Sequence, residues 1–244
     1  MIKDFFIYFN KKDISIRFYI VAVAIFFIGI FFIKKDVDIF LKIFYISMGL
    51  FEIGFVVWVY SFFKKYINFE YVKFFWFFFH LAVLWLAAVY ASKIVSKGLE
   101  LPSSDYSYTI SFFTFFCYPP AFLYIATAIG LLFYIVFIFA YSILSIFKRE
   151  ILSDGFPILH FIGFVITIFL FSLGHDKLMS FYYYKAPKYV RKIAYETDYQ
   201  YMPKYLDNFS EMNKQVKIKL HENGVYSILT KQEDEYILEV GKFK

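Results

Sequence analysis

The sequence has a single cysteine, Cys117, in 244 residues, and no long polar stretch before residue 176. One cysteine excludes a disulfide framework and a cysteine-based metal site within one chain. The four histidines are too scattered for a metal-binding motif, and no hydrolase elbow, phosphate-binding loop or deaminase signature occurs. We therefore expect neither an enzyme nor a cofactor.

Charged residues are nearly absent from a series of apolar stretches in the first three quarters of the chain. Hydrophobic residues make up 61% of the sequence, and the mean hydropathy is +0.58. Each stretch is about as long as a helix that crosses a bilayer. The stretches are 15–33, 39–63, 74–96, 121–147 and 158–174. The first is too long for a removable signal peptide and lacks a small-residue cleavage site.

These stretches predict an all-α polytopic transmembrane bundle of five or six spans over residues 1–175. Residues 176–244 are polar and rich in lysine, and they predict a small soluble α+β domain. The net charge is +6, and the basic residues cluster beside the spans. We therefore expect contact with anionic lipid headgroups of a cell membrane, and no contact with nucleic acid.

The number of spans depends on the effect of Pro119 and Pro120. Residues 106–118 are apolar but only thirteen long, and the prolines after them are expected to break a helix. With five spans, this segment lies at the interface or re-enters the membrane. With six, residues 104–118 cross as a short helix and the prolines form a turn. Six spans place most basic residues on one side, so we favour six, with both termini cytoplasmic.

The end of the chain has the two-residue period of β-strands. Apolar and polar residues alternate over 216–220, and Asn223-Gly224 is a typical hairpin turn. Residues 225–230 and 236–240 are predicted as two further strands, which completes a three-stranded antiparallel meander. A helix is expected over 203–215, because Pro203 suits a first helical turn.

Aromatic and basic residues interleave over 181–192, a composition typical of a segment in the headgroup layer. Four of them are candidates for contact with lipid headgroups: Lys185, Lys188, Arg191 and Lys192. A nucleotide ligand, or no more than control of the topology, is the alternative.

Glu52 falls near the middle of the 39–63 stretch, where a charge is costly and often marks an ion path or a proton relay. His80 lies about two turns into the next stretch. Because consecutive spans are antiparallel, Glu52 and His80 are candidates for a pair. The alternative is that Glu52 stays protonated and bonds a nearby Ser, Tyr or backbone carbonyl, and that His80 packs against polar neighbours.

A haem between two histidines would require a partner for His80. With six spans, His160 lies toward the opposite side of the membrane and His175 only at its boundary. We therefore expect no haem.

Small hydroxyl side chains recur on one face of the 104–118 helix, at spacings of three and four. They are Ser104, Ser107, Ser111 and Thr114. They either line a polar pathway or support close packing, with each hydroxyl bonded to its own backbone or to a neighbouring helix. Gly54, Gly163 and Thr167 are small residues of other spans, which suits close helix contacts within the chain or between copies.

Three functions fit these features. The first is a small oligomeric membrane subunit of the effector or sensor type, with a cytoplasmic tail for docking or regulation, as in bacterial defence or toxin–immunity systems. The second is an ion channel or transporter that uses Glu52. The third is an accessory structural subunit of a larger membrane complex.

Overall fold

The computed structural model describes residues 13–66, 69–147, 156–201, 216–221, 224–232 and 235–242. The chain forms two compact units. One comprises Met1–Phe78 and Ala126–Ser172, and the other Phe79–Ile125 and Leu173–Lys244. The described helices are α2 (Ile14–Ile30), α3 (Val37–Tyr66), α4 (Glu70–Leu99), α5 (Ser107–Phe147), α6 (Phe156–Lys185) and α7 (Pro187–Thr197), with the short 3₁₀ helix η1 (Ser103–Asp105) before α5.

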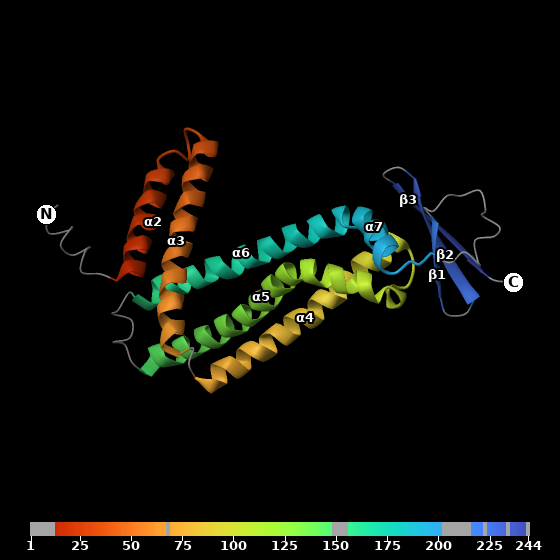
Figure 1. Ribbon diagram of the computed structural model, residues 1–244. Coiled ribbons are helices and arrows are strands. Elements are labelled where there is room, and N and C mark those ends of the chain that lie inside the picture. The colour runs from red at the N-terminus through yellow and green to blue at the C-terminus, as the bar shows by residue number, and fades with distance from the viewer. Residues whose placement is uncertain are drawn as a thin grey trace. The chain divides into compact units, whose positions relative to one another are not determined.

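The first unit contains α2 and α3 as an antiparallel helical hairpin (Figure 1). Asp36 begins α3, because its carboxylate accepts the backbone N–H groups of Asp38 and Ile39 at 2.9 and 3.0 Å. The two helices approach closely at Gly54, where a Cβ atom would lie 2.9 Å from the carbonyl oxygen of Ser15. A helical hairpin with glycine at the contact is the packing expected of helices in lipid.

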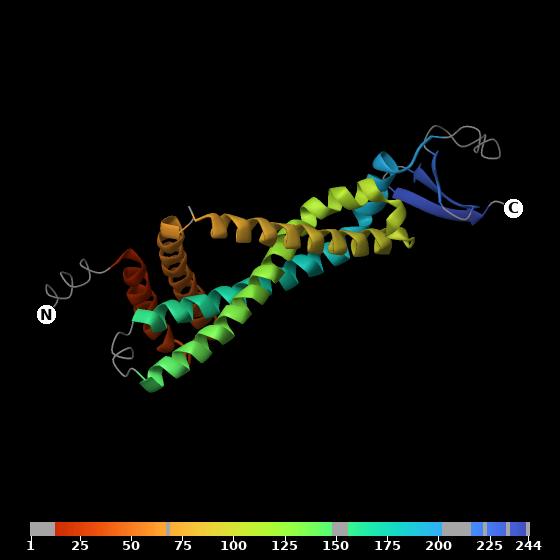
Figure 2. The ribbon, with the colours of Figure 1, turned by 90° about the horizontal axis from the view of Figure 1, so that it is seen from below.

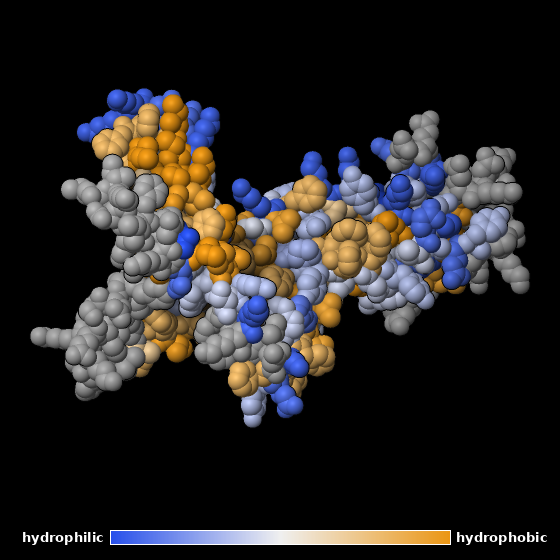
Figure 3. Space-filling model, turned by 60° about the vertical axis from the view of Figure 1, so that its left-hand side comes forward, coloured by the Kyte–Doolittle hydropathy of each residue, from blue (hydrophilic) through white to orange (hydrophobic). Residues whose placement is uncertain are grey.

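Among the residues that the structure describes, four helical segments are long and apolar enough to cross a membrane. They are Val37–Ser61, Glu70–Leu99, Ser107–Ala140 and Leu159–Lys185. Helix α2 is apolar but shorter, and its 17 residues span roughly 26 Å. Figure 3 shows apolar side chains over the α2–α3 hairpin and hydrophilic ones at its tip. By helix length and hydropathy, the chain has the make-up of a multi-pass membrane protein.

The expectation that Pro119 and Pro120 break a helix is wrong. Helix α5 runs without interruption from Ser107 to Phe147 and contains both prolines (Figures 1 and 2). Proline removes a backbone donor, but a helix in apolar surroundings tolerates it where a neighbouring helix packs against it. Here Pro120 is buried, and His175 on α6 donates from Nδ1 to its carbonyl oxygen at 2.9 Å. The turn required by six spans, and the separate re-entrant segment of the five-span alternative, therefore do not form.

The second unit contains α7 and the C-terminal sheet. Strands β1 (Val216–Leu220), β2 (Val225–Gln232) and β3 (Glu235–Lys242) form an antiparallel sheet in the order β1-β2-β3, which confirms the predicted meander. Gly224, with φ of +70°, precedes β2. The helix expected over 203–215 lies outside the described residues, and the domain boundary expected at residue 175 falls inside the continuous helix α6.

Candidate functional site

Polar side chains from three helices of the first unit come together among apolar ones. The hydroxyl of Tyr19 on α2 lies 2.9 Å from Nδ1 of His160 on α6. The Oε1 atom of Glu52 on α3 lies 2.8 Å from the Thr167 hydroxyl, also on α6. We call Tyr19, Glu52, His160 and Thr167 the interhelical polar cluster. Its members bond in pairs across helix contacts.

Aromatic rings and small residues hold this cluster. The Trp58 ring stacks on the His160 ring, with centroids 4.4 Å apart and an angle of 17° between planes. At Gly163, one turn before Thr167, a Cβ atom would lie 2.8 Å from Cβ of Phe55. Gly163 therefore permits a close helix contact within one chain, which is one of the two roles that the sequence left open for it.

The structure gives Glu52 and His80 different partners. Glu52 bonds Thr167 in the first unit, whereas His80 bonds and stacks on Tyr118 in the second. The sequence left open that Glu52 bonds a nearby Ser, Tyr or backbone carbonyl. Its partner is a hydroxyl, as in that alternative, but the hydroxyl belongs to a threonine. Tyr19 was missed, because no local pattern distinguishes it from the other tyrosines.

The four predicted hydroxyl residues do not share one helix face, because α5 begins only at Ser107 and Ser104 lies in η1. The Ser111 hydroxyl donates to the carbonyl oxygen of Ser107, and Thr114 donates to that of Ile110, both at 2.8 Å. These bonds to the helix's own backbone agree with the packing alternative.

A second group of polar side chains lies in the second unit, where the sheet meets η1, α5 and the residues after α7. His221 Nδ1 donates to Asp105 Oδ2 at 2.7 Å, and its Nε2 atom lies 2.7 Å from the Ser227 hydroxyl. The Tyr199 hydroxyl lies 2.7 Å from Ser227 Oγ and 3.1 Å from the Tyr106 hydroxyl. We call these five residues the tail network.

Asp105, His221 and Ser227 have the connectivity of a hydrolase triad. However, Ser227 is fully buried on the central strand, and Tyr199 occupies its remaining side. Burial raises the pKa values of Tyr106 and Tyr199, so both phenols keep their protons and remain donors. A substrate cannot approach a serine enclosed in this way. The hydrogen bonds of His221 to Asp105 and Ser227 instead connect the sheet to η1.

Two charged side chains connect α7 to the neighbouring helix ends. Asp198 is buried, and its Oδ2 atom accepts the backbone N–H of Thr109 at 2.8 Å and the Thr109 hydroxyl. Arg191 donates from Nε to the carbonyl oxygen of Gly98 at 3.1 Å. The Asp198 carboxylate therefore lies at the N-terminal end of α5, and the Arg191 guanidinium lies at the C-terminal end of α4. Both placements are favourable with respect to the helix dipoles.

The predicted headgroup residues divide into two kinds. Lys185, Lys188 and Lys192 are exposed. Arg191 is half-buried and bonds within the protein, since it also donates to the Tyr236 carbonyl oxygen and lies 3.8 Å from Glu100. The sequence could not distinguish these roles, because the partners of Arg191 lie in distant segments.

Among the described residues, no group of three or more His, Cys, Asp or Glu side chains is arranged to hold a metal ion. Comparisons with models of protein families, with curated proteins and with solved structures found no match to this chain.

Proposed function

We propose that the chain is a multi-pass membrane subunit of the sensor or effector type, whose C-terminal domain regulates the membrane helices. The observation that supports this most directly is the contact of one short helix with two helix ends. Arg191 and the residue after α7, Asp198, bond the end of α4 and the start of α5. Helix α6 leads into α7 through Ala186 alone.

Such contacts favour transmission of a signal between the tail and the helices. Hydrogen bonds to a buried carboxylate are stronger than those between neutral groups, and breaking the bonds to Thr109 leaves the Asp198 charge with fewer partners. The sheet is bonded to α7, since Lys217 on β1 donates from Nζ to the Tyr195 carbonyl oxygen at 2.8 Å. A partner that displaces the sheet and keeps this bond moves α7 and strains its bonds to α4 and α5. We also propose that the tail is cytoplasmic and that the chain associates with further copies of itself or with another protein.

The experiment uses the full-length protein in nanodiscs and an antibody fragment raised against the exposed surface of β3. We expect binding to change hydrogen exchange in the first turn of α5. Asp198→Ala is expected to reduce this change strongly, because it removes the two hydrogen bonds of the carboxylate to Thr109 and leaves only the contact of the Thr197 hydroxyl. Glu196→Ala is the matched control, since its side chain is exposed. An unchanged α5 in the wild type on binding would refute the regulatory role.

A second function, movement of protons or ions through the membrane, is supported by Glu52. Its Oε2 atom is buried, and no hydrogen-bond partner for it occurs among the described residues. In addition, the Thr167 hydroxyl lies 2.8 Å from Glu52 and 2.9 Å from the Gly163 carbonyl oxygen. One hydroxyl hydrogen cannot serve both acceptors fully. A protonated Glu52 that donates to Thr167 satisfies both contacts.

Flux through proteoliposomes tests this second function. Glu52→Gln keeps the shape of the side chain but removes its ability to release a proton, so we expect loss of flux at normal expression. Glu70→Gln is the control, because Glu70 is exposed at the start of α4. Equal flux in wild type and Glu52→Gln would eliminate the idea.

A further inference from the structure

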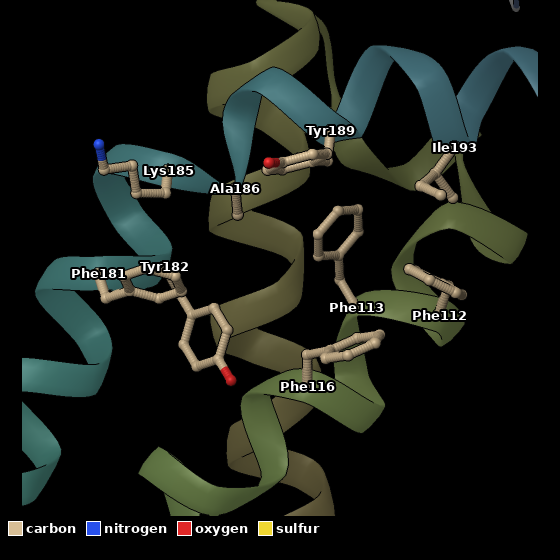
Figure 4. A pocket seen from close by; sticks show the side chains of 9 residues that line it. All are labelled: Phe112, Phe113, Phe116, Phe181, Tyr182, Lys185, Ala186, Tyr189 and Ile193. Carbon is tan, nitrogen blue, oxygen red and sulfur yellow. The ribbon is translucent and has the colours of Figure 1, made fainter.

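A cavity of about 270 Å³ lies in the second unit, between the first turns of α5, the end of α6 and α7. Its wall is formed mainly by aromatic rings, including Phe112, Phe113, Phe116 and Phe181. Figure 4 shows the Phe113 ring and the Ala186 methyl group pointing into the space between the helices. The stem of Lys185 completes one side, while its ammonium group points away from the cavity (Figure 4).

The cavity lies at the ends of two candidate membrane spans. The span in α6 ends at Lys185, and the span in α5 begins at Ser107. Tyr182 and Tyr189, which also line the cavity, suit this level, because tyrosine and lysine are enriched where the hydrocarbon meets water. In a bilayer crossed by these two spans, the cavity would lie at the depth where acyl chains meet their headgroups.

The lining and the size of the cavity restrict the occupant. Sites for small soluble ligands measure about 300–1,000 Å³ and contain a few precisely placed polar groups. This cavity is smaller and its wall is apolar. Water in it would lack the two to four polar partners that an ordered buried water requires. A single hydrocarbon chain meets both conditions.

We infer that the cavity holds one acyl chain of an anionic phospholipid whose headgroup contacts Lys185. The exposed Lys188, in the first turn of α7, adds positive charge close to Lys185. This inference rests on the membrane location of α5 and α6. It does not depend on the proposed regulatory role of the tail.

Native mass spectrometry of the full-length protein in a nonionic detergent tests the inference, with phosphatidylglycerol and phosphatidylcholine of identical chains as probes. We expect the wild type to retain one phosphatidylglycerol per chain and at least fivefold less phosphatidylcholine. Ala186→Leu, which extends a side chain into the cavity, is expected to lower retention of phosphatidylglycerol at least fivefold. Ala82→Leu is the matched control, because Ala82 is exposed on α4.

The charge at the mouth is tested separately. Lys185→Gln is expected to remove the preference for phosphatidylglycerol, whereas Lys177→Gln, an exposed lysine two turns earlier on α6, is expected to keep it. Ile193→Phe fills the cavity from another wall, so the test stands even when Ala186→Leu does not fold. Equal retention of the two lipids by the wild type, or full retention by a folded cavity-filling variant, would overturn the inference. The antibody experiment on α5 detects failure of the proposed function independently.

Discussion

At the scale of residues, Tyr199 shows how the tail network stabilises the C-terminal domain. Tyr199→Phe removes the hydroxyl 2.7 Å from Ser227 Oγ and leaves a buried group without one of its bonds. We expect a loss of about 1–3 kcal/mol in the free energy of unfolding near neutral pH. Thermal unfolding of the full-length protein measures it. Tyr189→Phe, at an exposed position of α7, is expected to unfold as the wild type does.

The stabilising effect of Tyr199 depends on pH. Burial raises the pKa of Tyr199 in the folded protein. An unfolded tyrosine loses its proton near pH ~10, whereas the folded one keeps it, so the stability of the fold decreases as pH rises beyond that value. Tyr199→Phe has no proton to lose at this position. The difference in the free energy of unfolding between wild type and Tyr199→Phe should therefore become smaller above pH ~10. A difference that stays constant with pH would contradict this account.

The sequence could not predict the tail network. His221 and Asp105 are 116 positions apart, and Tyr106 and Ser227 are 121 apart. Each residue by itself has the appearance of an ordinary polar residue in a turn or strand. Glu52 was predictable as a site of interest because its signal is local: one acidic residue within a long apolar stretch.

At the scale of elements, the packing of α7 on α4 depends on Gly98. A Cβ atom at this position would lie 2.6 Å from Cβ of Val190 on α7. Alanine favours a helix over glycine by about 1 kcal/mol, but overpacking a close contact costs about 1–3 kcal/mol. We expect Gly98→Ala to destabilise the docking of α7, measured by hydrogen exchange in that helix.

Two comparisons make this prediction specific. Gly49→Ala on α3 meets no atom within 4 Å, so it is expected to leave α7 unchanged and to stabilise α3. Val190→Ala in the Gly98→Ala background removes the two methyl groups 3.0 Å away but keeps the Cβ atom, so it should restore only part of the protection of α7. If Gly98→Ala alone leaves hydrogen exchange in α7 as it is in the wild type, the close contact between Gly98 and Val190 is refuted.

Elements with local periodicity were predicted well, and those decided by neighbouring helices were not. The alternation of apolar and polar residues over 216–220 specified strand β1 in full. In contrast, Pro119 and Pro120 have the same local chemistry in a turn and in a continuous helix. The contact of His175 on α6 with the Pro120 carbonyl oxygen joins segments 55 positions apart, so no local pattern predicts it.

At the scale of the whole molecule, the contacts of α7 have a consequence for topology. Because Arg191 bonds the end of α4 and Asp198 bonds the start of α5, we expect the segment between these helices to lie on the same side of a membrane as the C-terminal domain. The six-span topology instead places this segment and the tail on opposite sides. If α4 crosses the membrane, its first residue, Glu70, faces the side opposite to the tail.

Cysteine labelling distinguishes these topologies. In a Cys117→Ser background, Ser104→Cys and Glu70→Cys each introduce one thiol at an exposed position. We expect an impermeant maleimide to label Ser104→Cys only from the side that carries the C-terminal tag, and Glu70→Cys only from the other side. Labelling of both from one side would show that α4 does not cross. Labelling of Ser104→Cys from the side opposite to the tag would contradict the docking of α7 on α4 and α5.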